Sequence, residues 1–262
     1  MNKDLKDLKE GFLNAIKDSF DAYNKYGPRS NKKLIPIHSW FANEIISELG
    51  HGYSSMSLGS GSEGSEGSEG SEYEIEGKYY PKKLDITIFS NEKPIVAMSF
   101  KFVTSNYAQN SNNYFENLLG ETANIRRIGV GFVHFLVLRG HPPYFYKAAG
   151  NEWGDEKGTE KLSEHHIKKY IKLFEDSDWP HKPDVLGMAI IDFDEDGNPY
   201  FSDLRELGLQ QETIKIIEDE FSIERFIQRV IALCKPNIKK IEDEFSIGRF
   251  IQRVIALCKP KK

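Results

Sequence analysis

The sequence predicts an α/β fold in which a mixed central β-sheet is flanked by helices. Two observations support this prediction. Helical patterns precede a group of three strand-like segments, and helical and strand-like segments alternate further along the chain. In addition, the run 129–139 is apolar on both faces, as expected for a buried central strand. A chain of 262 residues is long enough to bury a sizeable core.

The expected elements follow one another as two helices, three strands, and then a helix, a strand, a helix and a strand. They cover residues 5–23, 37–49, 73–79, 84–89, 95–102, 111–127, 129–139, 161–174 and 185–193. Gly50 ends the second helix. The sequence SNEK forms the turn between the second and third strands. Ser111 or Asn112 is a suitable N-cap for the helix after the third strand.

The composition is that of an ordinary globular protein, with 39% hydrophobic and 29% charged residues. A formal net charge of −5 excludes a uniformly basic nucleic-acid coat but leaves room for a local basic cleft. The two cysteines occupy equivalent places in a repeat and indicate no disulfide framework. We see no signal-peptide core, and no apolar run approaches the roughly 20 residues that span a bilayer. A cytoplasmic protein without a membrane segment is therefore expected.

The segment 60–72, SGSEGSEGSEGSE, has nothing to bury. Repeats of this composition form flexible, soluble spacers. We interpret it as an engineered linker that replaces a native loop. A natural low-complexity loop is the alternative.

A second unusual feature is a tandem repeat, because residues 217–236 recur almost unchanged at 241–260. Only Glu224 and Gly248 differ between these two stretches. A solenoid needs three or more units, so two near-identical copies indicate a recent or artificial duplication. Each copy encodes an amphipathic helix, with Ser222 or Ser246 as its N-cap. One copy is expected to cover the sheet, and the other to pack beside it or to contact another molecule.

The segment DFDEDGNPYFSD, residues 192–203, has the approximate spacing of a calcium-binding EF-hand loop. Such a loop needs a helix on each side, whereas the preceding segment has the pattern of a strand. The Asp-Gly-Asn-Pro sequence is therefore interpreted as a hairpin turn.

Two charged residues stand inside the apolar strands of the hairpin, Asp85 in the first and Lys101 in the second. Because side chains alternate with a period of two, Ser99 and Lys101 share one face, and Asp85 is expected to converge with Lys101 at one end of the hairpin. A carboxylate can hold Mg²⁺, and a nearby lysine can orient or deprotonate water and stabilise phosphate charge. A buried Asp85–Lys101 ion pair is the simpler alternative.

The sequence YPKKLD, followed by a hairpin and SFK, resembles the motif of the PD-(D/E)XK nuclease superfamily. The expected order of elements over 37–139 also resembles the core of that fold. The resemblance implies one nuclease domain over residues 1–262 with a restriction-endonuclease-like core. It also implies Mg²⁺ as cofactor, Asp85 as a metal ligand and Lys101 as the group that helps to activate water.

Two departures from the motif stand out. Pro81 is not adjacent to Asp85, and Ser99 stands where an acid is expected. One subset of type II restriction endonucleases is similar here, with Ser-X-Lys on the strand and the second carboxylate on the following helix. This similarity implies that Glu116 is the second metal ligand, with Glu121 as the alternative. Otherwise Ser99 is an inactivating substitution. The superfamily pattern also implies a part for Glu44, on the helix before the hairpin, in binding the metal.

The segment after Lys101 is rich in amides, which read adenine edges and bind phosphates. The expected DNA contacts are Asn106, Gln109, Asn110, Asn112 and Asn113. The alternative is a helix-capping loop. The resemblance thus implies a type II restriction endodeoxyribonuclease acting on double-stranded DNA as a homodimer. A repair nuclease or junction resolvase of the same fold, or a disabled DNA-binding module, are the alternatives.

Overall fold

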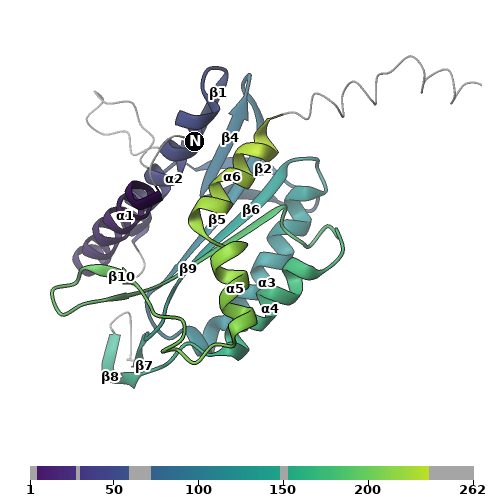
Figure 1. Cartoon of the computed structure of the whole chain (residues 1–262). Coiled ribbons are helices and arrows are strands. Elements are labelled where there is room, and N and C mark those ends of the chain that lie inside the picture. Colours follow the sequence, from purple (N-terminus) through teal and green to yellow (C-terminus); the bar gives the residue numbers. More distant parts are fainter. Residues whose placement is uncertain (1–4, 28–29, 59–71, 148–152, 236–262) are drawn as a thin grey trace, which may run out of the picture.

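A computed structural model describes residues 5–27, 30–58, 72–147 and 153–235 (Figure 1). Its centre is a six-stranded sheet with the strand order β1-β4-β5-β6-β9-β10. Helices cover both faces of this sheet, so the predicted α/β fold with a mixed central sheet is confirmed. Residues 60–71 of the expected linker and the second copy of the repeat lie outside the described residues.

The helices are α1 (Leu5–Tyr26), the 3₁₀ helix η1 (Asn31–Leu34), α2 (Ile35–Leu49), α3 (Tyr107–Arg126), α4 (Glu164–Glu175), α5 (Gln211–Asp219) and α6 (Ile223–Cys234). The central sheet contains β1 (Tyr53–Ser57), β4 (Ile86–Ser90), β5 (Lys93–Val103), β6 (Gly131–Arg139), β9 (Val185–Phe193) and β10 (Pro199–Phe201). Two separate hairpins are formed by β2 (Tyr73–Glu76) with β3 (Pro81–Leu84), and by β7 (Pro143–Lys147) with β8 (Trp153–Thr159).

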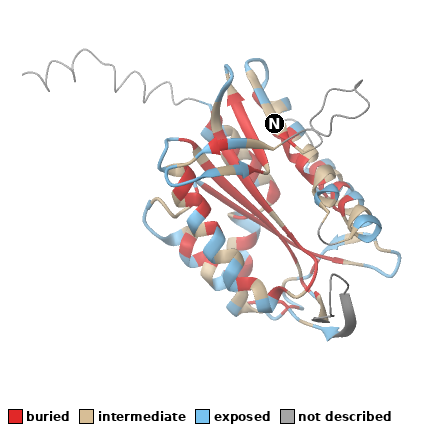
Figure 2. Cartoon of the chain, turned by 180° about the vertical axis from the view of Figure 1, so that it is seen from behind, coloured by how far each residue is buried: buried red, intermediate tan, exposed pale blue. Residues whose placement is uncertain are grey.

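The middle of the sheet is parallel and its edges are antiparallel. The strands β5, β6 and β9 run in the same direction, whereas β1, β4 and β10 pair antiparallel with their neighbours. Every residue of β6 from Phe132 to Leu138 is buried, as Figure 2 shows for the central strands. Burial on both faces explains the continuous apolar run in the sequence.

Each face of the sheet carries its own core. On one face α1, α2 and α6 contribute Phe12, Phe41 and Phe226, which pack around Phe135 of β6. On the other face α3, α4 and α5 form the second core. Since α6 belongs to the first copy of the repeat, the expectation that one copy covers the sheet is confirmed.

The single strand predicted over 73–79 is wrong. The segment turns at Gly77, and β2 pairs with β3 instead of extending into the central sheet. The strands β1, β7, β8 and β10 were not predicted either. They are short and carry polar or irregular sequences without a clear alternation, which is the signal that a sequence offers. The turn expected before Pro199 is present, and Gly197 adopts a φ of +78° in it.

The helix α3 begins four residues before the expected N-cap Ser111. Asn106 precedes its first turn in the left-handed region, with φ 49°, and makes no side-chain capping bond. Its amide instead holds β7, because Nδ2 donates to the carbonyl of Phe145 at 3.0 Å and Oδ1 accepts from the backbone N–H of Phe145 at 3.0 Å. Ser111 lies inside the helix and donates to the carbonyl of Ala108.

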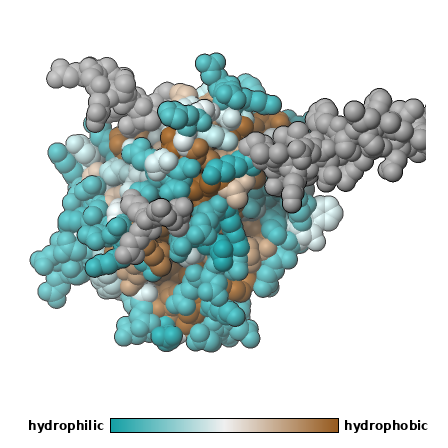
Figure 3. All heavy atoms as spheres, turned by 45° about the horizontal axis from the view of Figure 1, so that its top comes forward, coloured by the Kyte–Doolittle hydropathy of each residue, from teal (hydrophilic) through white to brown (hydrophobic). Residues whose placement is uncertain are grey.

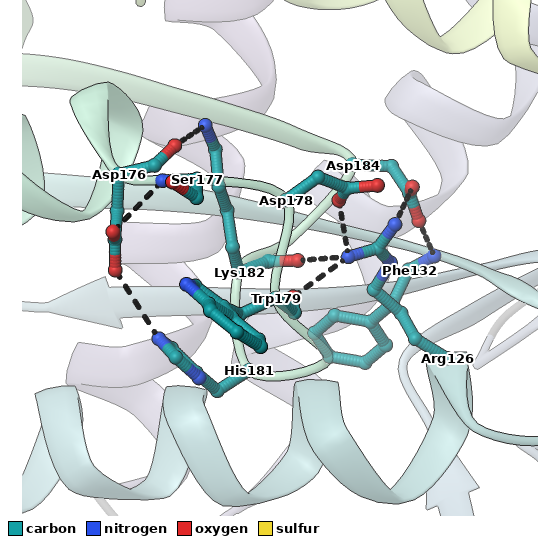
Figure 4. Close-up of polar contacts among 9 residues, drawn as sticks. All are labelled: Arg126, Phe132, Asp176, Ser177, Asp178, Trp179, His181, Lys182 and Asp184. Atoms are coloured by element: carbon teal, nitrogen blue, oxygen red, sulfur yellow. Dashed lines mark hydrogen bonds and ion pairs between the residues drawn. The ribbon is translucent and has the colours of Figure 1, made fainter.

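The other end of α3 is fixed by Arg126 (Figure 4). Its guanidinium pairs with Asp184 at 2.8 Å and with Asp178 at 2.9 Å, and donates to the carbonyls of Trp179 and Lys182. The second oxygen of Asp184 accepts from the backbone N–H of Phe132, at the start of β6. One carboxylate thus links α3 to the sheet, and this link fixes the helix that carries the candidate site residues.

Hydrophilic side chains cover most of the face shown in Figure 3, with apolar atoms reaching the surface between them. Within the described ranges, no helix is both long and apolar enough to cross a membrane.

Candidate active site

The candidate site lies on the carboxyl-terminal half of β5. Phe100 points into the core formed by α1, α2 and α6. Ser99 and Lys101 occupy the alternate positions and therefore face the side of α3. Ser99 is 2% exposed, whereas Lys101 is partly exposed.

Asp85 lies at a bend between β3 and β4, directly beside β5. Its Oδ2 accepts a hydrogen bond of 2.6 Å from the backbone N–H of Phe100. The expected approach of Asp85 to the strand that carries Lys101 is therefore observed. Across the described residues, Asp85 and Lys101 form no ion pair, so the structure does not support the simpler alternative.

Glu121 of α3 is the second carboxylate at this place. Its Oε2 accepts from the hydroxyl of Ser99 at 3.1 Å, and its Oε1 pairs with the ammonium of Lys82 on β3 at 2.7 Å. Glu121 is 7% exposed, and burying a carboxylate is costly unless its oxygens find such partners. Its carboxylate therefore lies beside Ser99, the position at which the motif has an acid.

Glu116 lies elsewhere, which corrects the expected assignment. Five residues of helix separate Glu116 from Glu121, a rotation of about 140° around the axis. Glu116 is exposed, and its negative charge acts on Lys169 of α4. Glu121, the alternative in the sequence prediction, is the residue that stands next to Ser99.

The β2–β3 hairpin brings Lys82 to Glu121, and Asn124 of α3 holds the turn of this hairpin. Its Oδ1 accepts from the backbone N–H of Tyr79 at 2.8 Å, and its Nδ2 donates to the carbonyl of Tyr80 at 2.9 Å. Gly77 is required here, because a Cβ at this position would lie 2.2 Å from Asn124 Nδ2. The sequence analysis did not predict these contacts between Asn124 and the hairpin.

Glu72 is a further carboxylate near Asp85. The last pair of the β2–β3 ladder joins Tyr73 to Leu84, so continuing the register places Glu72 opposite Asp85. Burial raises the pKa of Glu72, and the charge of Asp85 raises it further, while Lys82, Lys83 and Lys101 oppose this shift.

Two buried histidines flank β5 at the same level, and the sequence prediction missed both. His134 of β6 pairs with Ser99 in the register of the parallel strands, and His38 of α2 packs edge-on against the ring of Phe100. Burial lowers the pKa of His134 well below 6.5, and the nearby charge of Lys101 lowers it further. Burial also lowers the pKa of His38, with Asp85 opposing and Lys101 adding to this effect. Burial thus favours the neutral form of both side chains.

The helix α2 brings His38, rather than Glu44, to this place. Glu44 lies six residues further along, about 9 Å of helical rise. The expected role of Glu44 in metal binding therefore stays a prediction.

A cleft of about 460 Å³ opens directly beyond Lys101, at the carboxyl end of β5. Lys33, Thr104, Ser105 and Asn110 line it, and burial lowers the pKa of Lys33. The cleft begins at Phe102, the residue after Lys101, whereas Asp85, Glu121 and Lys101 themselves do not line it.

The amides expected to contact DNA lie on the first turns of α3. Asn106 is less suited to this role, because its Nδ2 and its Oδ1 each form a hydrogen bond with the backbone of Phe145. Gln109 donates to the hydroxyl of Tyr144, and Asn110 donates to the carbonyl of Asn106. Two others are exposed: Asn112, which accepts from Lys169, and Asn113.

The donor set has the chemistry that Mg²⁺ prefers, since Asp85 and Glu121 offer carboxylate oxygens. Both carboxylates are anchored to consecutive residues of β5, Phe100 and Ser99. In the described part of the chain, no group of three or more histidine, cysteine, aspartate and glutamate side chains is arranged to hold a metal. Asp85 and Glu121 would be the two carboxylate ligands of an ion bound here, and both oxygens of Glu121 are engaged, by Ser99 and by Lys82.

Comparison with known proteins found no matching family model, no similar curated protein and no similar solved structure.

Proposed function

We propose that the chain is a Mg²⁺-dependent endodeoxyribonuclease of the type II restriction class that hydrolyses phosphodiester bonds in double-stranded DNA. One observation carries this proposal. Asp85 and Glu121 are anchored to consecutive residues of β5, and Lys101 follows on the same face as Ser99. The motif that the sequence resembles has three such groups: an acid, a second acid that reaches the strand from the helix, and a lysine.

Each residue has a chemical role in this proposal. Asp85 and Glu121 would hold Mg²⁺, which would supply stabilisation of negative charge on the phosphate. Lys101 orients the attacking water or accepts its proton, and its ammonium form stabilises phosphate charge. Ser99 positions Glu121 by donating a hydrogen bond to it. Lys82 neutralises Glu121 and keeps it at the strand before metal binds.

The cleft beyond Lys101 suits a DNA backbone. Hydroxyls, amides and a lysine are groups that contact phosphates in protein–DNA complexes, and Thr104, Ser105, Asn110 and Lys33 supply them. A symmetric duplex site calls for two copies of the chain related by a twofold axis. A homodimer is therefore part of the proposal.

The experiment is incubation of the full chain with long duplex DNA and Mg²⁺, with an EDTA control. Discrete fragments that depend on Mg²⁺ support the proposal. Random fragments, or a preference for branched DNA, would point to a repair nuclease or a junction resolvase. Tight binding without cleavage at any Mg²⁺ or Mn²⁺ concentration would point to a disabled DNA-binding module. The Lys82–Glu121 ion pair, which uses one oxygen of the second carboxylate, favours that second candidate function.

A further inference from the structure

The first copy of the repeat packs against one face of the central sheet, at a place that we call the slot. Five residues of α6 are buried in the core on the face shared with α1 and α2: Ile223, Phe226, Ile227, Val230 and Cys234. The ring of Phe226 lies 4.9 Å from that of Phe135 and 5.8 Å from that of Phe41. Gly187 of β9 makes room for it, because a Cβ there would lie 2.6 Å from Phe226 Cδ2.

The residues just before α6 also take part in this packing, and we call the segment that fills the slot the plug. Phe221 is fully buried on the opposite core, and its carbonyl accepts from the backbone N–H of Met188 on β9. Arg229 of α6 pairs with Glu220 and donates to its carbonyl, which closes the turn between α5 and α6. The plug therefore joins both cores of the sheet.

Every one of these groups recurs in residues 237–260. Matching the sequences with an offset of 24 residues aligns 213–236 with 237–260. Phe226 corresponds to Phe250 and Phe221 to Phe245. The residue types of the ion pair and of the remaining buried positions of α6 also recur in the sequence, as Glu244 and Arg253, and as Ile247, Ile251, Val254 and Cys258.

The two copies differ at three positions, and each difference weakens the second copy. Asn237 replaces Thr213, whose buried hydroxyl donates to Glu164. Lys240 replaces Ile216, which packs against the second core. Gly248 replaces Glu224, an acidic residue in the first turn of α6, and glycine is a poor helix former.

We propose that residues 237–260 are a spare plug for the α5–α6 slot of the same chain. The first copy fills the slot in the unaltered protein because its three distinctive residues fit better. The second copy enters when the first is weakened. A looped-out segment of 24 residues does not forbid this exchange, since the entropy of loop closure changes only slowly with length.

The cysteines report which copy is in the slot. Cys234 is 5% exposed in α6, and burial raises the pKa of its thiol to about 12. A plug in the slot thus protects its own cysteine from a thiol reagent at neutral pH, and the displaced plug does not. Mass analysis of the labelled peptides distinguishes Cys234 from Cys258.

The first test places a charge in each plug. Phe226→Asp should leave a cooperatively folding protein in which Cys258 is protected and Cys234 reacts. Phe250→Asp, the matched control, should leave the melting temperature and the protection of Cys234 unchanged. The double variant should lose cooperative unfolding. If Phe226→Asp unfolds as completely as the double variant, with both thiols reactive, the proposal is wrong. If the folding of Phe226→Asp improves as the protein concentration rises, the second copy comes from another molecule, and the proposal of an exchange within one chain is wrong.

A second test leaves both cores intact. The triple variant Asn237→Thr, Lys240→Ile, Gly248→Glu makes the two copies equal. After unfolding and refolding, each cysteine should be protected in a substantial share of molecules, with close to one protected thiol per chain. Complete protection of Cys234 together with complete reactivity of Cys258 would contradict the exchange.

Discussion

Ser99 donates a hydrogen bond of 3.1 Å to Glu121, although 22 residues separate the two in the chain. The hydroxyl is too small to replace a metal-binding carboxylate. In the proposed site, the buried Glu121 takes the place of the carboxylate that the strand lacks. This pairing places two acids, Asp85 and Glu121, and the lysine Lys101 around one strand, although the motif on the strand itself lacks an acid.

Ser99→Ala removes the donor from Glu121 but leaves Lys82 as its partner. We expect the free energy of unfolding to fall by about 1.5 to 3 kcal/mol, the range for hydrogen bonds to charged groups. Cleavage should continue, because Glu121 stays at the strand. Urea unfolding and a cleavage assay measure the two effects.

Ser99→Glu separates this account from the alternative of an inactivating substitution. If Glu121 is the second metal ligand, Ser99→Glu should place another carboxylate against it and lower the stability of the protein. If the unaltered chain is inert and Ser99→Glu cuts DNA, Ser99 is the inactivating substitution and Glu121 is not the second metal ligand.

Asp85→Asn and Lys101→Met should each reduce the rate of cleavage by at least about a hundredfold, as expected for a lost metal ligand and a lost proton-transfer group. Both replacements nearly keep the size of the side chain, so the melting temperature should change little. Lys93→Met, at the exposed start of the same strand, is the control. If either variant cuts DNA at the normal rate, the substituted residue does not belong to the active site. Unfolding of Lys101→Met would assign that lysine a structural role.

The buried histidines predict how stability depends on pH. In the unfolded chain a histidine gains a proton below about pH 6.5, whereas the lowered pKa values of His38 and His134 keep both neutral in the fold. Their contribution to stability is therefore complete above pH 6.5 and is lost as the pH falls. The free energy of unfolding should decrease toward acid by up to about 1.4 kcal/mol per pH unit for each histidine.

Urea unfolding between pH 7.5 and pH 5 tests this dependence in the unaltered chain and in His38→Asn, His134→Asn. The double variant should be less stable at pH 7.5 but should show a flatter decline. An unchanged decline would mean that the two histidines do not cause it.

Glu72 should oppose folding at neutral pH. Its pKa is raised in the fold, so its ionisation favours the unfolded chain, and this penalty vanishes once both states are protonated below about pH 4. Glu72→Gln should therefore stabilise the protein at pH 7 and not at pH 3.5. In the background of Asp85→Asn the gain should be smaller, because part of the shift comes from Asp85. An equal gain in both backgrounds would show that the two carboxylates do not interact.

Much of the fold could be predicted from local patterns. The apolar run of β6 and the alternation along β5 are properties of contiguous sequence, and both strands are present. The β2–β3 hairpin could not be predicted in this way. Its position depends on Asn124, more than 40 residues further along the chain, and on the space that Gly77 leaves.

In the candidate site, too, some features could be predicted from local patterns and others could not. Alternation along the strand was enough to place Ser99 and Lys101 on one face. The choice of Glu121 over Glu116 was also available from the sequence, since Leu118 and Ile125 lie three residues before and four residues after Glu121 on the buried face of α3. Proximity along the chain was the wrong criterion, because the direction of a helical side chain depends on its angle around the axis.

The most direct test of the central claim compares Glu121→Gln with Glu116→Gln in Mg²⁺-dependent cleavage of long duplex DNA. Both glutamates lie on α3, but only Glu121 contacts Ser99 and Lys82. We predict that Glu121→Gln abolishes cleavage while the protein remains folded, and that Glu116→Gln cuts at the normal rate. Normal cleavage by Glu121→Gln, or loss of cleavage in Glu116→Gln alone, would contradict the proposed site.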